Sequence, residues 1–531
     1  MIKPRRTWLL GTAAGSLGAM SGLPLAALAE AANNGTVVVG STTAPEHLNS
    51  AIQPGLATML PAAQLFASPL RMDEQWRPQP YLAQAWRVSE DQLNLHLKLS
   101  KTAQFHDGTP VTTADLLFSI ETVQRHHPFK SLLAPVKAVT IEDRQSAVIR
   151  LAHPHPALVS VLSTPFMPIL PKHVFGDGQN INTHPGNLAP VGSGPFKLVD
   201  FAPGEQIVLE RFSEFFEPAA PKLRRILYRR YASPAALLAA LAKGEIDLHL
   251  QLNSTVEMTR AEKNDDLRVL KDAAPALGPL VWVAFNTRHP KLSDKRVRQA
   301  INYALDKEFI VNTVLGGLPK RSTGPIASAS PFYSAQVNHY PQDLDKAMAL
   351  LESAGLSADD NGVRLSLQID ALPGNPDVKL IQEYLIPSLA KVGIEASLRS
   401  SREFETWARR IANHDFEVTV DSVWNWGDPV VGVHRTWDSK NIRKGVIWSN
   451  TQQYASPKVD ELLKAGASTA NDKARKSIYA ELQSVITEDC PVAFLCELPF
   501  NYGINRRVVE PPRSVWGMLS PATQMHVRTS T

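Results

Sequence analysis

Cysteine is scarce in this chain of 531 residues, which contains two, Cys490 and Cys496. So few thiols exclude a disulfide-rich scaffold. The segment between them is apolar and predicts a strand, which would hold their Cα atoms about 20 Å apart. A disulfide needs a separation below about 7 Å, so we expect two buried, unpaired thiols.

A large excess of charge is also absent. The formal net charge is +4, and Lys3, Arg5 and Arg6 account for most of it. The rest of the chain is nearly neutral. This argues against nucleic acid as a partner, because such interfaces need clustered lysine and arginine residues. Beyond residue 30, no apolar run approaches the roughly 20 residues of a membrane-spanning helix, so we expect the mature chain to be soluble.

Common catalytic and metal-binding motifs are missing as well. The chain contains no G-x-S-x-G, H-E-x-x-H or G-x-x-x-x-G-K sequence. The pairs His126-His127 and His153-Pro154-His155 have no cysteine or carboxylate at ligand spacing, so they do not predict a metal site. We therefore expect no catalytic residues, no metal and no cofactor.

Residues 1–29 are interpreted as a secretory signal peptide. Arg5 and Arg6 precede a moderately apolar stretch interrupted by glycines, and residues 27–29 form an A-x-A cleavage pattern. The paired arginines are similar to a twin-arginine signal, although its usual serine and lysine are missing. Ordinary Sec export and an uncleaved membrane anchor remain alternatives. Export predicts an extracytoplasmic mature chain.

The first part of the mature chain predicts a meander-like α+β block. A buried strand is expected at 36–41. Leucines that alternate with polar residues over 93–99 predict a half-buried antiparallel strand. Thr112 and Asp115 form a capping-box pair that begins a helix.

The later part predicts β-α-β units. Each unit consists of two apolar strands joined by a helix, which makes the strands parallel and the crossover right-handed. No repeat of 20–50 residues is visible, which disfavours a solenoid or a propeller. The expected strands lie at 226–231 and 246–250, at 280–287, and at 365–369 and 394–398.

The order of these elements, together with several motifs, resembles the extracytoplasmic solute-binding proteins of ABC importers, family 5, which includes peptide, nickel and opine binders. The motifs follow the family's order over nearly the whole mature chain. They are LAQAW at 82–86, FHDGTPVTTAD at 105–115, VGSGPF at 191–196, AFNT at 284–287, DKRVRQAI at 294–301, GDP at 427–429 and YASPKVD at 454–460.

The resemblance implies an α/β fold of the two-lobed periplasmic binding protein type (type II, cluster C-like), with an extra α+β domain inserted in lobe one. The antiparallel block that precedes the β-α-β units fits this arrangement. The implied boundaries are 36–78, 190–281 and 497–531 for lobe one, 79–189 for the inserted domain, and 283–495 for lobe two.

The resemblance also places a ligand between the lobes, close to residues 423–429. Trp424 and Trp426 share one side of an expected strand, where they would stack on a ligand or fill the core. In peptide-binding relatives, an acid shortly after a tryptophan holds the ligand's ammonium group. Here Asp428 is the one acid that follows the tryptophans, so either it takes this role or the role is absent. Asn425 is a further candidate ligand-binding residue.

Four more ligand-binding candidates follow from the resemblance. Trp407 matches a tryptophan-bearing segment that lines the pocket in oligopeptide-binding relatives. Arg410 would meet a ligand carboxylate with its fork of donors, or lie on a solvated helix face. His47 and Asn49 follow the first strand, where lobe one of the family reaches the cleft.

We therefore expect a periplasmic binding protein that captures a peptide or peptide-like small solute and delivers it to an ABC permease in the inner membrane. A monomer with no enzymatic activity is expected. A non-peptide solute, such as an opine or a glycoside, is the first alternative. An exported hydrolase on the same scaffold, or a chaperone that uses the same groove, are further alternatives.

Overall fold

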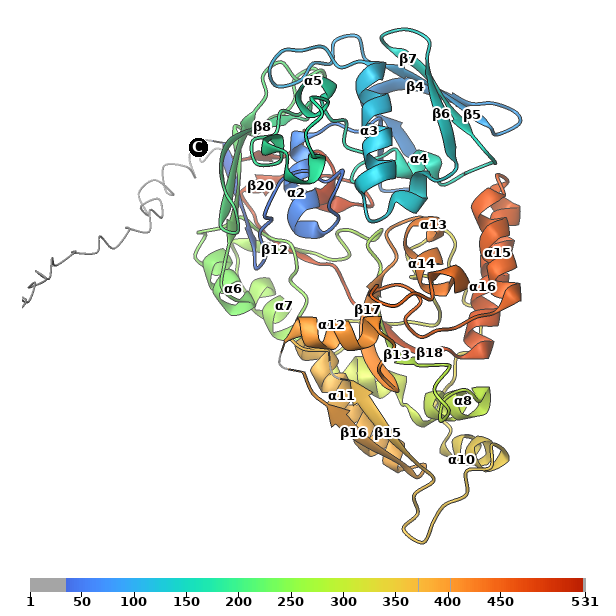
Figure 1. The fold of residues 1–531 in the computed structure, drawn as a ribbon. Coiled ribbons are helices and arrows are strands. Elements are labelled where there is room, and N and C mark those ends of the chain that lie inside the picture. Colours follow the sequence, from blue (N-terminus) through green and yellow to red (C-terminus); the bar gives the residue numbers. More distant parts are fainter. Residues whose placement is uncertain (1–34, 371, 402, 529–531) are drawn as a thin grey trace, which may run out of the picture.

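The computed structural model describes residues 35–370, 372–401 and 403–528. Two large sheets lie in different halves of the molecule, and a smaller sheet lies in the same half as the first (Figure 1). The expected signal peptide lies outside the described residues. Within the described part of the chain, no helix is both long enough and apolar enough to cross a membrane.

Lobe one is built on a seven-stranded sheet in which β1 lies between β10 and β11 and is parallel to both. The first predicted β-α-β unit is therefore confirmed, although its second strand is shorter than expected. In strand order, the sheet contains β12 (Leu267–Leu270), β19 (Tyr502–Asn505), β11 (Leu248–His249), β1 (Thr36–Ser41), β10 (Arg225–Arg230), β9 (Gln206–Arg211) and β8 (Phe196–Ala202).

Helices cover this sheet, and apolar residues of β1 alternate between its two faces. Val37 and Val39 belong to the largest hydrophobic core, whereas Val38 packs in a separate core that includes residues of two helices. Ser233 accepts the Ala236 N–H and so begins the connecting helix, as predicted. The helices of this lobe are α2 (Leu56–Leu65), α6 (Pro234–Ala242) and α7 (Thr255–Glu262).

The inserted domain carries an antiparallel four-stranded sheet, as the alternating leucines predicted. The predicted capping box of Thr112 and Asp115 is present at the start of α3. The strands, in sheet order, are β4 (Ala83–Val88), β5 (Asn94–Leu99), β7 (Ser146–Leu151) and β6 (Val136–Ile141), and the helices are α3 (Thr113–His126), α4 (Leu158–Val161) and α5 (Lys172–Phe175). Two short antiparallel strand pairs complete this half of the molecule, β2 (Leu70–Met72) with β3 (Pro78–Pro80) and β20 (Val508–Val509) with β21 (His526–Val527).

Lobe two is built on a six-stranded mixed sheet. The second predicted β-α-β unit is confirmed, because β15 and β16 are parallel neighbours joined through α11. In order, the strands are β14 (Lys320–Arg321), β18 (Val492–Glu497), β13 (Pro279–Phe285), β17 (Val418–Trp424), β15 (Leu365–Asp370) and β16 (Ile394–Arg399). The helices are α8 (Lys295–Ala304), α9 (Lys307–Phe309), α10 (Leu344–Ser353), α11 (Pro376–Ala390), α12 (Phe404–Ala412), α13 (Pro429–Gly432), α14 (His434–Trp437), α15 (Pro457–Ser468) and α16 (Asp472–Asp489).

Strand β13 is buried on both faces, which explains its unbroken apolar sequence. Val281, Val283 and Phe285 belong to one core of lobe two, and Leu280 and Trp282 belong to the other. The central strand therefore ties the helices of both faces into one rigid layer.

Both thiols are buried and unpaired, as predicted. Cys490 ends α16 in a left-handed conformation, and Cys496 lies in β18. Burial raises the pKa of the Cys490 thiol to about 11, so it is inert at neutral pH.

The chain passes between the two large sheets along two adjacent segments, 271–278 and 498–501. The Ala273 N–H donates to the Phe500 carbonyl at 2.8 Å, and the Leu498 N–H donates to the Pro279 carbonyl at 2.9 Å. These two segments, which we call the crossing, join β12 to β13 and β18 to β19.

Close packing at Gly192, in the VGSGPF motif, gives a test of this fold. A Cβ at this position would lie 1.9 Å from the Leu65 carbonyl oxygen, at the end of α2. We expect Gly192→Ala to lower the free energy of unfolding by about 1–3 kcal/mol, measured by urea denaturation. Gly324→Ala is the control, because the nearest atom would lie 3.8 Å away. Equal stability of the two variants would contradict the packing described.

Candidate functional site

A cavity of about 1170 Å³ opens between the lobes, where strand ends from both large sheets meet. Lobe one contributes the end of β1 and the loop after it (residues 40–46), the start of α2 and His249 at the end of β11. The inserted domain contributes Phe129, and lobe two contributes the end of β17 and residues beyond it. A crevice at the carboxyl ends of strands is the usual ligand position in α/β folds. We call this space the interlobe cavity.

Trp424 and Trp426 both line the interlobe cavity, so the structure brings together the two aromatic residues singled out in the sequence. Their rings stack with centroids 5.5 Å apart and planes inclined by 28°. Trp424 also contacts Phe500 of the crossing, and Trp426 contacts Phe166 of the inserted domain. Trp426 is 8% exposed, so Trp424 offers more of its surface to a ligand.

Gly427 directly follows Trp426 and lets the chain turn away from the sheet. It has φ +79°, and an added Cβ would lie 2.9 Å from the Trp516 ring. The Gly427 N–H donates to the Ala276 carbonyl of the crossing. The tryptophan pair is therefore anchored against lobe one at the point where the chain changes lobes.

Asp428 does not line the interlobe cavity. Both of its carboxylate oxygens accept hydrogen bonds from Arg475 of α16, each at 2.7 Å, and the pair is buried. The pKa of Asp428 is lowered by the Arg475 charge despite burial. This geometry disagrees with the expected amine-binding role, because the carboxylate already has its counter-charge. The Asn425 side chain is also turned inward. Its Oδ1 accepts the Ala327 N–H, and its Nδ2 donates to the Pro325 carbonyl.

Trp407 and Arg410 lie outside the cavity lining on α12. Trp407 is fully buried in a small core, and its indole N–H donates to the Thr419 hydroxyl at 3.2 Å. Arg410 forms an ion pair with the buried Asp370 at 3.0 Å. Both side chains therefore stabilise lobe two internally, which differs from the ligand contacts that the resemblance implied for them.

His47 and Asn49 follow β1 as expected but face the protein. Asn49 is fully buried and donates to the Asn187 side chain at 2.9 Å. The His47 Nδ1 accepts the Asn49 N–H. Glu46, directly before His47, is the last of residues 40–46 that line the interlobe cavity.

Several lining residues were not predicted from the sequence. They are Phe129, His249, Arg435, Trp448 and Phe500. They come from five separate segments, and no local motif distinguishes them. The one available signal was their aromatic or basic character next to predicted strand ends.

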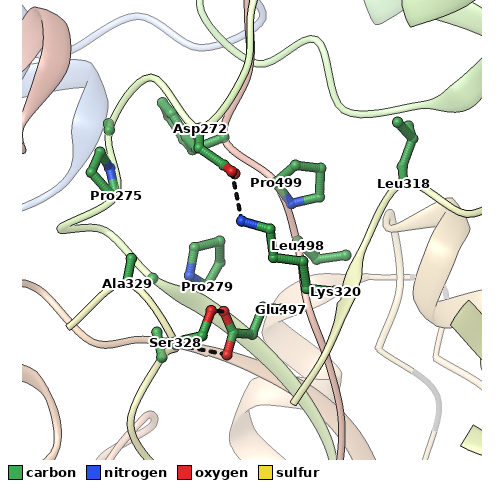
Figure 2. Close-up of a pocket in the computed structure, with 14 residues that line it drawn as sticks. Asp272, Pro275, Pro279, Leu318, Lys320, Ser328, Ala329, Glu497, Leu498 and Pro499 are labelled. Atoms are coloured by element: carbon green, nitrogen blue, oxygen red, sulfur yellow. Dashed lines mark hydrogen bonds and ion pairs between the residues drawn. The ribbon is translucent and has the colours of Figure 1, made fainter. Parts of the chain in front are cut away.

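A second, small hollow lies beside the crossing (Figure 2). Asp272 of the crossing forms an ion pair with Lys320 of β14 at 2.6 Å. Glu497 accepts hydrogen bonds from the N–H and the hydroxyl of Ser328. With a volume of about 70 Å³, this hollow holds a water molecule or two and is too small for a solute. Within the described ranges, no three His, Cys, Asp or Glu side chains converge as a metal site requires.

Comparisons with known proteins agree with this architecture. The model of "Bacterial extracellular solute-binding proteins, family 5 Middle" matches residues 77–445. The oligopeptide-binding protein AppA of Bacillus subtilis is 26% identical over 497 residues, which cover 87% of this chain and 86% of that protein. The glutathione-binding protein GsiB of Pectobacterium atrosepticum is 24% identical, with 92% of each chain covered.

A solved structure shows the same fold. The ABC transporter substrate-binding protein CtaP of Listeria monocytogenes superimposes with a TM-score of 0.82 at 24% identity, over 94% of this chain and 100% of that one.

The Asp428–Arg475 pair can be tested directly. We expect Asp428→Asn to lower the free energy of unfolding by about 3–5 kcal/mol, because Arg475 is left buried without its counter-charge. Asp272→Asn is the control, since this ion pair is exposed and worth at most about 1 kcal/mol. Urea denaturation measures both. Weaker ligand binding by Asp428→Asn at unchanged stability would restore the amine-binding role.

Asp421 of β17 predicts a pH dependence of stability. Burial raises the pKa of its carboxyl to about 7, although the Ser422 N–H, the Trp448 indole and the Arg435 charge each act to lower it. The unfolded value is about 3.9, so the folded chain binds the proton more tightly. This carboxyl therefore lowers stability as pH rises from about 4 to 7, by at most about 4 kcal/mol.

We expect Asp421→Asn to remove this loss. The variant should gain stability relative to the unmodified protein as pH rises through this window, and the gain should level off above pH 7. Urea denaturation at a series of pH values measures it. A constant difference between the two proteins across the window would contradict a buried, proton-binding Asp421.

Proposed function

Because the chain belongs to the bacterial extracellular solute-binding proteins of family 5, we propose that its interlobe cavity captures a peptide or peptide-like small solute. The protein then delivers the solute to the membrane permease of an ABC importer. The observation that carries this proposal is a cavity of about 1170 Å³ whose walls come from both lobes and from the inserted domain.

Closure of the lobes explains how such a cavity would capture a solute. Contacts that a ligand makes with both walls at once exist only when the lobes are together, so the ligand shifts the population toward the closed form. The walls already approach each other at Phe129 and Arg435, where the guanidinium carbon lies 5.8 Å from the ring centroid. The crossing is the natural hinge, since it joins the two large sheets.

The size and lining of the cavity favour a ligand larger than a single amino acid. Typical small-molecule pockets measure about 300–1,000 Å³, and this one exceeds that range. Two relatives are an oligopeptide-binding protein and a glutathione-binding protein, which supports a peptide ligand. The stacked Trp424 and Trp426 favour a second candidate, a non-peptide organic solute with a flat apolar group.

We further propose that the protein is exported through its N-terminal segment and acts in the periplasm as a monomer without enzymatic activity. The lack of a G-x-S-x-G, H-E-x-x-H or G-x-x-x-x-G-K motif in the sequence supports the absence of enzymatic activity. The family's extracellular character supports export.

A thermal-shift screen tests the ligand class. Di- to pentapeptides, glutathione, opines and glycosides are added one at a time to the exported chain. A solute present at 100 times its Kd should raise stability by about 2.7 kcal/mol. Stabilisation by peptides supports the proposal. Stabilisation by another class alone would overturn the peptide assignment and favour the second candidate.

Trp424 gives a mutational test of the cavity. We expect Trp424→Ala to weaken binding of a peptide found in the screen by about 30-fold, as removal of a buried aromatic anchor does. Isothermal titration calorimetry measures the change. Phe309→Ala is the control, because Phe309 is an exposed aromatic residue outside the lining. Equal affinities of the two variants would remove Trp424 from the site.

A further inference from the structure

The lining of the interlobe cavity contains a guanidinium without an acidic partner. Arg435 of α14 donates from Nε to the Gly432 carbonyl at 3.1 Å, and from its two terminal nitrogens to the Trp448 and Trp424 carbonyls at 3.1 and 3.2 Å. Among the described residues, no carboxylate forms an ion pair with it. Three of its five N–H donors are used, which leaves two for a ligand.

Desolvation makes this missing counter-charge significant. Burial lowers the pKa of Arg435 to about 10, which shows that the charge is held in a poorly solvated place. A buried charge is costly unless it is paired. A ligand anion that enters the cavity would supply the partner and gain a charge-assisted hydrogen bond, which is about twice as strong as a neutral one.

The nearby acids do not provide that partner. Asp421 is the acid whose charge acts on Arg435, but among the described residues the two side chains form no ion pair, and with a pKa of about 7 the Asp421 carboxyl is half protonated at neutral pH. Asp438 uses its side chain to cap a short helical turn. Glu46 lies at the exposed edge of the lining, on the opposite lobe.

A second unused donor belongs to His249, a residue of the cavity lining in lobe one. His249 is 2% exposed, and its Nδ1 accepts the Gln251 N–H, which places the proton of the neutral ring on Nε2. This Nε2 has no hydrogen-bond partner within the part of the chain that the structure describes. Burial lowers the pKa of His249 to about 4, so the ring is a neutral donor. Lining residues of both walls therefore carry unused donors, which favour acceptor atoms on the ligand.

We propose that Arg435 is the anchor for a carboxylate of the ligand, and that the solute is recognised through this carboxylate and an adjoining apolar or aromatic group rather than through an ammonium group. This inference rests on the proposed function and deepens it. For a peptide, the anchored group is the C-terminal carboxylate or an acidic side chain. Arg435 takes the role that the sequence suggested for Arg410, which is already paired with Asp370.

The surroundings of Arg435 fix where the apolar group lies. The guanidinium bonds the carbonyl of Trp424, whose ring stacks on Trp426, and it lies against the Phe129 ring. A carboxylate on Arg435 therefore places the next atoms of the ligand beside aromatic faces. Among the described residues of the cavity lining, Glu46 is a carboxylate without an ion pair, but it lies on the opposite wall and not beside Arg435.

End-modified ligands test this inference on the unmodified protein. The tripeptide Ala-Phe-Ala is measured by calorimetry in four forms: free, N-acetylated, C-amidated and modified at both ends. N-acetyl-phenylalanine and its amide are measured alongside as non-peptide probes. We expect C-amidation to weaken binding by about 10- to 100-fold, as loss of a charged hydrogen bond does. N-acetylation should change affinity by less than about 3-fold.

Variants locate the effect. Arg435→Gln should abolish the preference for the free carboxylate, and Arg435→Lys should keep part of it, because lysine retains the charge without the fork. Arg409→Gln is the matched control at an exposed arginine outside the lining. Thermal denaturation of each variant confirms that it is folded.

The outcomes separate the two proposals. If the tripeptide binds equally well with and without its carboxylate, the carboxylate anchor is overturned and peptide capture stands. If no peptide binds but N-acetyl-phenylalanine binds through Arg435, the anchor stands and peptide capture fails. If neither class binds, both are overturned. If N-acetylation rather than C-amidation weakens binding, recognition occurs through the amine and the anchor is wrong.

Discussion

The paired crossing between the lobes is the constraint on which the rest of the structure depends. Segments 271–278 and 498–501 run side by side and are joined by main-chain hydrogen bonds, including one from Ala273 to Phe500. Because β13 and β19 both start from this place, the ends of β1, β11 and β17 are directed at one common gap. The position of the cavity is thus a property of topology, and side chains then determine what it accepts.

Local patterns in the sequence predicted the elements that surround this gap. The capping box of Thr112 and Asp115, the alternating leucines of β5 and both β-α-β units depend on residues close together in the chain, and the structure contains each of them. The resemblance to family 5 then supplied the order of the lobes, which a single sequence does not contain. The Trp424 and Trp426 pair was found because both residues lie in one short segment.

Side-chain partners that come from a distant segment could not be predicted from the sequence. Asp428 forms an ion pair with Arg475 of α16, and Arg410 forms one with Asp370 of β15. The charges of both residues are therefore paired within lobe two. No spacing rule indicates such pairs, because the fold brings together elements that are far apart in sequence. Arg435 was not predicted for the same reason. An arginine indicates an anion site only when the structure shows that no acidic side chain is paired with it.

The three carbonyls that hold Arg435 come from β17, from α13 and from the loop at Trp448, so folding has already fixed the rotamer of this long side chain. An arginine free in solution would lose about 2 kcal/mol of rotamer entropy when a ligand orders it, and here that loss falls on folding instead of on binding. A solute therefore meets a preorganised receptor. The affinity for the solute then depends on how well folded lobe two holds Arg435 in place. Recognition is thereby coupled to strands of lobe two that do not contact the solute.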